Sequence, residues 1–308
     1  MTSKSFRQSK HGAMKKLHKL AKAYRVDHGK RFRLKDFDPA DTRTFQSKED
    51  ASAALQDGVA RLIALQDRLY AQDRWAVLLL FQGMDAAGKD SAIKHVMSGV
   101  NPQGCQVYSF KAPTGEERTH DYLWRTMQRL PERRRIGIFN RSYYEEVVVV
   151  RVHPDLLKNE NIPPPLISDR IWEDRFEDIC AFERYLIHNG IVVRKFYLNL
   201  SKEEQARRFL ARLEEPRKNW KFSAADIHER EHWNEYMEAY EDMIRNTATS
   251  AAPWYAVPAD HKWFTRLVVA AAIVDTLDEL NLTYPKVDAD RQKELADARR
   301  IVELELQR

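Results

Sequence analysis

Apolar residues recur at helical spacing in the part of the chain before position 74. The stretches Met14–Arg25 and Ser47–Tyr70 carry them three and four residues apart, the pattern of a helix with one buried face. The inward positions are Leu17, Leu20, Ala21 and Tyr24, then Leu55, Val59, Leu62 and Leu69. Ser47, followed by Asp50 three residues later, is typical of a capped helix start. We predict that residues 1–73 form a disordered basic tail over the first dozen residues, two helices and a short strand at Arg31–Leu34.

From Trp75 onwards the pattern changes to an alternation of strands and helices. Trp75–Gln82 is a continuous apolar run, as expected for a central parallel strand covered on both faces. Further strands are predicted at Gln106–Phe110, Ile136–Asn140, Ile191–Leu200 and Trp254–Val257, and helices at Ser91–Ser98, Glu117–Leu130, Leu166–Asn189, after Ser201, from Asp226 and at Lys262–Leu280. We therefore predict one α/β core at residues 74–285, with a parallel central sheet and a helical lid at about 207–235. Residues 286–308 are interpreted as a charged tail helix.

Composition narrows the class of protein. Of 308 residues, 43% are hydrophobic and 31% charged, and no apolar run reaches the roughly 20 residues of a membrane helix. The two cysteines, Cys105 and Cys180, match no metal spacing, so we expect a reduced cytoplasmic protein with no membrane partner. The formal charge of +5 suits nucleic acid, an acidic membrane surface or a polyanionic substrate, and does not choose among them.

A phosphate loop follows the first strand of the core. Gly83-Met84-Asp85-Ala86-Ala87-Gly88-Lys89-Asp90-Ser91 contains the pattern GxxxxGK, and it leaves an apolar strand to enter a helix, the context that this pattern requires. Glycines let backbone N–H groups approach a phosphate, and the helix N-terminus adds a favourable dipole. Lys89 is expected to neutralise the transferred group. An ordinary glycine-containing turn is the alternative.

Two acidic residues of this loop point to a divalent cation. Asp90 replaces the usual Ser or Thr ligand, and Asp85 lies inside the loop, where it would repel phosphate unless a cation lay between them. Asp85 is therefore a candidate magnesium ligand, with a solvated loop aspartate as the alternative. The third strand ends in Asn140 where a Walker-B aspartate is usual. An amide binds magnesium more weakly than a carboxylate does. Asp85 and Glu145 are therefore expected to provide more of the magnesium binding.

At these motifs the chain resembles the family-2 polyphosphate kinases. The matching pieces are Gly83–Asp90, Phe139–Glu145, Arg208 with Arg212, Lys218–Ser223, Ala252–Trp254 and Asp260–Lys262, spread over residues 30–285. The resemblance implies a three-layer P-loop kinase fold of the thymidylate-kinase type, magnesium dependence and a homo-oligomer, a dimer or tetramer. With asparagine at position 140 and glutamate at position 145, the chain resembles the branch of this family that phosphorylates nucleoside monophosphates as well as diphosphates.

Basic residues after the strands are candidates for binding phosphate. Arg141 follows a strand end and can form a two-pronged contact with a phosphate, although a structural pair with a carboxylate is the alternative. Arg208 and Arg212 share one helix face, and with Lys218 and Lys221 they favour a closing lid over a merely solvated surface.

Lys111 follows the second strand, at the carboxyl edge where such folds bind ligands. It is expected to hold the acceptor nucleotide, unless Lys111–Thr114 is a plain turn. For each of Trp220, Trp254 and Trp263 we favour packing in the core or at an interface over base stacking.

The sequence thus predicts reversible, magnesium-dependent phosphoryl transfer between inorganic polyphosphate and AMP or ADP, forming ADP or ATP. Asp85, Lys89, Arg141 and Arg208 are the expected catalytic residues. An ATP-dependent nucleoside monophosphate kinase is the first alternative. A basic nucleic-acid-binding regulator with a degenerate nucleotide site is the second, disfavoured by the intact Lys89, so no nucleic acid is expected as a partner.

Overall fold

A six-stranded sheet in the order β1-β6-β5-β2-β4-β3 forms the centre of the fold. The computed structural model describes residues 3–307. The strands are β1 (Arg25–Val26), β2 (Ala76–Gln82), β3 (Cys105–Ser109), β4 (Ile136–Asn140), β5 (Ile191–Asn199) and β6 (Trp254–Pro258). Strands β2 to β6 are mutually parallel, whereas β1 pairs antiparallel with β6. The five predicted core strands are confirmed.

Strand β2 shows why the sheet is covered on both faces. All of its residues are buried, and it pairs with β4 on one side and β5 on the other. Its side chains alternate between two apolar clusters, Val77, Leu79 and Phe81 in one and Leu78 and Leu80 in the other. Because successive side chains of a strand point to opposite faces, a strand covered on both faces is apolar throughout.

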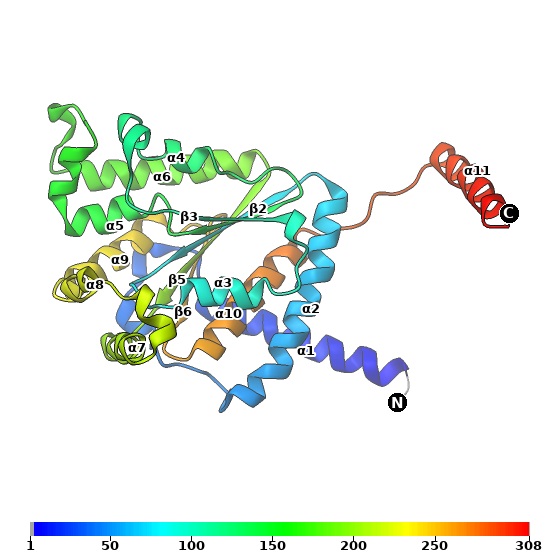
Figure 1. The fold of residues 1–308 in the computed structure, drawn as a ribbon, viewed down its shortest axis with the longest axis horizontal. Coiled ribbons are helices and arrows are strands. Elements are labelled where there is room, and N and C mark those ends of the chain that lie inside the picture. The colour runs from blue at the N-terminus through cyan, green and yellow to red at the C-terminus, as the bar shows by residue number, and fades with distance from the viewer. Residues whose placement is uncertain (1–2, 308) are drawn as a thin grey trace.

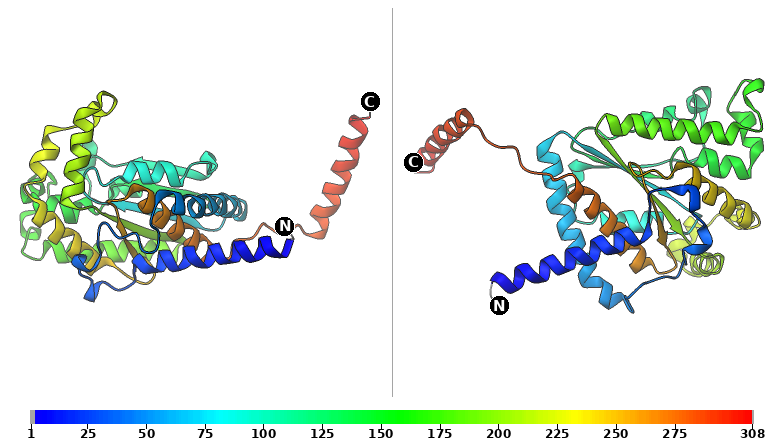
Figure 2. Two further views of the ribbon diagram at one scale, coloured as in Figure 1. Left: turned by 90° about the horizontal axis from the view of Figure 1, so that it is seen from below. Right: turned by 180° about the vertical axis from the view of Figure 1, so that it is seen from behind.

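Two groups of helices cover the two faces, and together with the sheet they make three layers (Figure 1 and Figure 2). One face is covered by α1 (Ser3–Tyr24), α2 (Lys48–Gln72), α3 (Lys89–Val96) and α10 (Lys262–Glu279). The other is covered by α5 (Glu145–Val152), α6 (Ile171–His188) and α9 (Trp233–Thr247). The remaining helices are α4 (Trp124–Met127), α7 (Lys202–Glu214), α8 (Ala224–Glu229) and α11 (Ala289–Glu305). This is the predicted three-layer α/β fold.

The predicted helix starts at Ser47 and Ser201 are confirmed. The Ser47 hydroxyl accepts a hydrogen bond from the Asp50 N–H at 3.2 Å, and Ser201 accepts one from the Glu204 N–H at 3.1 Å. Each cap satisfies a backbone donor that has no partner within its own helix. The Ser201 cap matters for function, because it starts the helix that lies against the phosphate loop.

The prediction of a disordered N-terminal tail is wrong for the described residues. Helix α1 begins at Ser3, well before Met14. Its second half packs as predicted, with Leu17, Ala21 and Tyr24 almost completely buried. No proline interrupts the sequence before Tyr24, so the helix continues outward from its packed half.

The short strand predicted at Arg31–Leu34 is also wrong. Two 3-10 turns, Gly29–Arg31 and Leu34–Asp36, occupy this region. Backbone groups there bind side chains of α9, since Arg245 donates to the Phe32 carbonyl at 2.8 Å and Glu241 accepts from the Leu34 N–H at 2.6 Å. These bonds replace the ladder that a strand would need.

The continuous helix predicted at Glu117–Leu130 is interrupted. A 3-10 turn at Gly115–Thr119 is followed by extended backbone at His120 and then by the single turn of α4. The Asp121 carboxylate accepts from the Leu123 N–H at 3.0 Å. This local bond competes with helix hydrogen bonding, which explains why the helical periodicity was misleading.

Helix α11 lies apart from the rest of the molecule at the end of an extended connection (Figure 1). Residues 283–307 are exposed throughout. Within the described residues, no helix combines the length and apolar character needed to cross a bilayer. The division of the chain at residues 73 and 285 stays an interpretation, although α1 and α2 share an apolar cluster with α10 of the core.

Candidate active site

The phosphate loop joins β2 to α3, as predicted. Gly83 and Gly88 have φ angles of +143° and +103°, and Ala86 has +63°. A Cβ at Gly83 would lie 2.8 Å from the Leu198 carbonyl oxygen, so the close approach of β5 requires glycine there. Gly88 is the residue before the first turn of α3 and lets the loop enter the helix. The loop is therefore built on backbone conformations that most side chains disfavour.

All five carbonyl oxygens of Gly83–Ala87 accept hydrogen bonds from three side chains. Lys89 binds the first two at 2.6 and 3.2 Å, Gln205 binds the third at 2.8 Å, and Arg208 binds the last two at 2.9 and 3.0 Å. Carbonyl oxygens would repel a phosphate, and here each one is tied to protein. The loop is thereby arranged to offer N–H groups to an anion.

Lys89 is buried beneath the loop, with 8% of its surface exposed. Burial, reinforced by the nearby Arg141, lowers the pKa of Lys89 to about 8. The ammonium group therefore remains protonated at neutral pH, but its charge is held in a poorly solvated place. A charge so held interacts more strongly with a phosphate than one in water.

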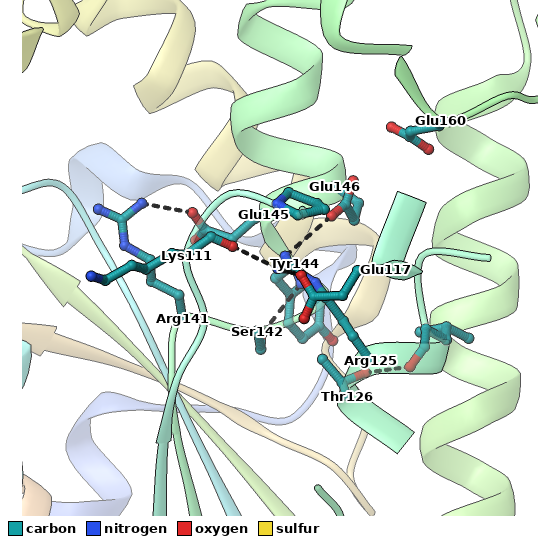
Figure 3. Close-up of polar contacts among 12 residues, drawn as sticks. Lys111, Glu117, Arg125, Thr126, Arg141, Ser142, Tyr144, Glu145, Glu146 and Glu160 are labelled. Carbon is teal, nitrogen blue, oxygen red and sulfur yellow. Dashed lines mark hydrogen bonds and ion pairs between the residues drawn. The ribbon is translucent and has the colours of Figure 1, made fainter. Parts of the chain in front are cut away.

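Arg141 lies between two carboxylates at the end of β4. Its guanidinium donates to Asp85 at 2.6 Å. It also donates to Glu145 at 2.9 Å (Figure 3). Its φ angle of +65° is in the left-handed region, which is uncommon for a residue with a side chain. Glu145 and Asp85 raise the pKa of Arg141. Burial opposes ionisation of Asp85, but Arg141, Lys89 and Arg212 outweigh it and lower the pKa of that carboxyl group.

Glu145 begins α5 and lies below the surface of the site. One carboxylate oxygen accepts from Arg141, and the other accepts from the Gln82 amide at 2.7 Å in the orientation that satisfies both ends of that amide. Its side chain is 15% exposed. In Figure 3, Glu145 faces Arg141, whereas Glu146 lies on the side of Arg125 and Glu117. The predicted role of Glu145 as a metal ligand stays a prediction.

The oxygen atoms near the end of β4 fit a magnesium ion. Asn140 donates from its amide nitrogen to Asp90 at 2.5 Å, which leaves its Oδ1 atom pointing elsewhere. That oxygen is buried and accepts no hydrogen bond from the described residues. Magnesium takes oxygen ligands, usually one or two from protein with the rest from phosphate and water. Asp85 and Asn140 are the residues that would hold it.

A cleft of about 1390 Å³ opens above the loop. Nine basic side chains line it, Lys89, Lys111, Arg141, Arg207, Arg208, Arg212, Lys218, Lys221 and Lys262. Four acidic side chains line it as well, Asp85, Asp90, Glu204 and Asp226, which leaves an excess of five positive charges. The structure thus brings the predicted loop residues 85–91 together with Asn140, Arg141, Lys111 and the lid cations. Gly83, Met84 and Glu145 lie outside this lining.

Arg208 lines the cleft, and it also holds together two parts of the core, with 6% of its surface exposed. Its place in a moving lid and its catalytic role stay predictions. Besides the loop carbonyls, its guanidinium binds the carbonyl oxygens of Ala259 and Asp260 at 2.5 and 3.0 Å and the Glu204 carboxylate at 2.9 Å. All of its donors have protein partners, because α7 lies directly against the loop.

The other lid cations have weaker partners. Arg212 lies 3.5 Å from an Asp226 oxygen, Lys218 contacts Glu215, and the Lys221 ammonium lies 5.0 Å from the centre of the Trp220 ring. Trp220 is 78% exposed at the cleft, so it does not pack in the core of this chain, whereas Trp254 is fully buried. Packing of Trp220 at an interface stays a prediction. Ser91 lines the cleft and accepts from Arg266 at 2.9 Å.

Lys111 is held at the cleft by a residue that sequence reasoning missed. Arg125 donates to the Lys111 carbonyl at 2.5 Å and stacks on Phe110 at 5.6 Å. Gln205 was also missed, although it lies one turn before Arg208 on the same face of α7, and that spacing was a usable signal. Lys262 lines the cleft from the start of α10, and the motif Asp260–Lys262 was the sequence signal for it.

Comparison with known proteins agrees with this geometry. The family model described as polyphosphate kinase 2 matches residues 45–285. An ADP-polyphosphate phosphotransferase from Rhodopseudomonas palustris is 50% identical over 279 residues, covering 90% of this chain and 96% of that protein. An AMP/ADP-polyphosphate phosphotransferase from Meiothermus ruber is 44% identical over 273 residues, covering 88% and 98%.

Among solved structures, polyphosphate kinase 2 from Arthrobacter aurescens superposes with a TM-score of 0.82 at 39% identity. That comparison covers 91% of this chain and 96% of the other. The family model spans the loop, the end of β4, α7 and the basic segment that follows, which together form the cleft. The chain belongs to the polyphosphate kinase 2 family.

Proposed function

We propose that this chain transfers the terminal phosphate of inorganic polyphosphate to AMP and to ADP, reversibly and with magnesium. The observation that carries the proposal is the cleft, which nine basic and four acidic side chains line. The carbonyl oxygens of loop residues 83–87 all accept hydrogen bonds from protein side chains, so they do not face a bound phosphate. A linear polyphosphate is a dense polyanion, and a groove of this charge attracts it as basic proteins attract nucleic-acid backbones.

The residues of the cleft supply position and charge. Phosphoryl transfer requires in-line reactants and neutralised equatorial oxygens rather than covalent catalysis. Lys89 lies at the entrance of α3, where its protonated amine can shift from the loop carbonyls to a phosphate. Arg141 is pre-positioned beside Asp85, and an incoming phosphate would compete for its guanidinium. A magnesium ion held by Asp85 and Asn140 would neutralise further charge on the phosphate oxygens.

The choice between AMP and ADP is the finest part of the proposal. One of the two relatives above is named for ADP and the other for both AMP and ADP. In this chain the Glu145 carboxylate fixes Arg141, the cation nearest to the loop aspartate. We propose that Glu145 favours AMP by holding Arg141 in place when the acceptor brings one phosphate fewer. Lys111, fixed by Arg125, is proposed to contact the acceptor.

A donor and acceptor matrix tests the function. The purified chain is incubated with polyphosphate or ATP as donor, AMP or ADP as acceptor, and with magnesium or a chelator, and nucleotides are separated by chromatography. We expect ADP and ATP to form from polyphosphate only in the magnesium arms. Transfer to AMP with ATP as donor, but not with polyphosphate, would support the monophosphate kinase alternative. Tight oligonucleotide binding without turnover would support the regulatory alternative.

Several expectations from the sequence remain predictions within this proposal. These are the cytoplasmic location, the absence of membrane and nucleic-acid partners, and assembly into a dimer or tetramer.

A further inference from the structure

Gln205 is a buried polar residue that the proposed mechanism does not use. It lies on α7 with 1% of its surface exposed, and it does not line the cleft. Its amide nitrogen donates to the Asp85 carbonyl at 2.8 Å. Its amide oxygen accepts from Arg230 at 2.6 Å. Both ends of the amide are therefore used, and neither can reach a substrate.

Helix α7 holds the phosphate loop through hydrogen bonds from two side chains one turn apart. Gln205 binds the carbonyl of residue 85 and Arg208 binds those of 86 and 87, so three successive peptide groups depend on one helix. Ala86, in the middle, has a φ of +63°, a conformation that its neighbours must hold in place. Asp85 carries the carboxylate that meets Arg141. Any shift of the Asp85 peptide therefore moves that carboxylate as well.

Arg230 connects these hydrogen bonds to helix α8. It follows α8, and its guanidinium binds the Lys202 carbonyl at 3.0 Å as well as Gln205. Helix α8 contributes Asp226 to the cleft, where it lies 3.5 Å from Arg212 of α7. Figure 1 and Figure 2 show α7 and α8 together at one end of the molecule, beyond the loop and α3. A continuous chain of hydrogen bonds thus runs from α8 through Gln205 to Asp85.

We infer that Gln205 is a positioning residue that couples the α8 segment, through Arg230, to the Asp85 peptide of the phosphate loop. A substrate that moves α8 then adjusts the loop carboxylate, and a loop that binds phosphate biases α8. This inference rests on the proposed function for its readout, which is phosphoryl transfer. The chemistry assigned to Gln205 is one hydrogen bond donated and one accepted, with no contact to substrate.

The rival explanation is that Gln205 merely fills space and satisfies buried groups. Glutamate separates the two, because Gln205→Glu keeps the shape and the acceptor for Arg230 but removes the donor that the Asp85 carbonyl needs. A structural role predicts changes in stability that match the changes in rate. A positioning role predicts a fall in kcat at a temperature where the variant is still fully folded.

The experiment compares Gln205→Glu, Gln205→Met, Arg230→Met and the double variant Gln205→Met/Arg230→Met. Matched controls are Gln292→Glu and Arg299→Met on the exposed helix α11. We expect Gln205→Glu to remain fully folded at the assay temperature, with a melting temperature lowered by the unpaired Asp85 carbonyl. Its kcat should fall about 10- to 100-fold, the size expected when a reacting group is slightly misplaced. The KM values for polyphosphate and nucleotide should change far less than kcat. The double variant should be no slower than Gln205→Met, since Arg230 acts through Gln205.

Wild-type kcat in Gln205→Glu would overturn the inference, and so would multiplicative losses in the double variant. If Gln205→Glu does not fold, Arg230→Met decides, and wild-type kcat there would refute the coupling. Failure of the proposed function is distinguishable, because the wild-type protein itself would then transfer no phosphate from polyphosphate.

Discussion

Replacing Lys89 by methionine tests the site most directly. Methionine keeps most of the length of the side chain and removes its charge. The lysine amine is a buried cation under the phosphate loop, 2.6 Å from the Gly83 carbonyl oxygen. Loss of one preorganised charge-stabilising donor typically removes about 3 kcal/mol of transition-state stabilisation. We therefore expect kcat to fall by at least ~100-fold.

The fold should survive this substitution, and the structure explains why. Burial lowers the pKa of Lys89 from an ordinary 10.5 to about 8, which corresponds to about 3 kcal/mol against the charged form at neutral pH. Methionine removes that cost. The variant also loses the two hydrogen bonds to Gly83 and Met84, which contribute roughly 1.5–3 kcal/mol each when the donor is charged. The relieved burial cost offsets most of the lost hydrogen bonding, so the free energy of unfolding should fall by only about 2 kcal/mol.

The assay measures steady-state formation of ADP and ATP from polyphosphate, alongside urea unfolding of the same samples. Lys158→Met is the matched control, since Lys158 is 78% exposed and pairs only with nearby Asp155 among its described contacts. A folded Lys89→Met protein with turnover within tenfold of the wild type would refute the phosphate-loop mechanism. Unfolding of the variant at neutral pH would refute the reasoning about stability.

Three further results are expected. Glu145→Asn should shift kcat/KM towards ADP because it loosens Arg141, and an equal loss for AMP and ADP would contradict this. Trp220→Ala should raise the nucleotide KM more than the polyphosphate KM, since only the nucleotide has a ring to stack, and Trp220→Phe should restore it. Burial raises the pKa of Glu146 from 4.5 to about 7. The wild type therefore loses stability as pH rises between these values. The melting temperature of Glu146→Gln minus that of the wild type should be larger at pH 8 than at pH 5. Calorimetry that gives a smaller difference at pH 8 would refute this.

The parts of the fold that sequence predicted are those with local causes. The apolar run of β2 follows from burial on both faces, and the phosphate loop follows from its glycines and the adjacent Lys89. The predicted strand Arg31–Leu34 failed because its backbone groups bond to side chains of α9, more than 200 positions away. Periodicity carries no information about such partners.

The candidate site divides in the same way. The loop, Asn140, Arg141 and the basic segment after α7 were predicted from motifs, and the structure places them around one cleft. Their partners were not predictable, because they come from distant parts of the chain. Arg141 is 56 positions from Asp85, and Arg208 is 122 positions from Ala86. Only the tertiary structure decided that Arg208, which lines the cleft, would bind the carbonyl oxygens of the phosphate loop, since that depends on where α7 packs against the loop that follows β2.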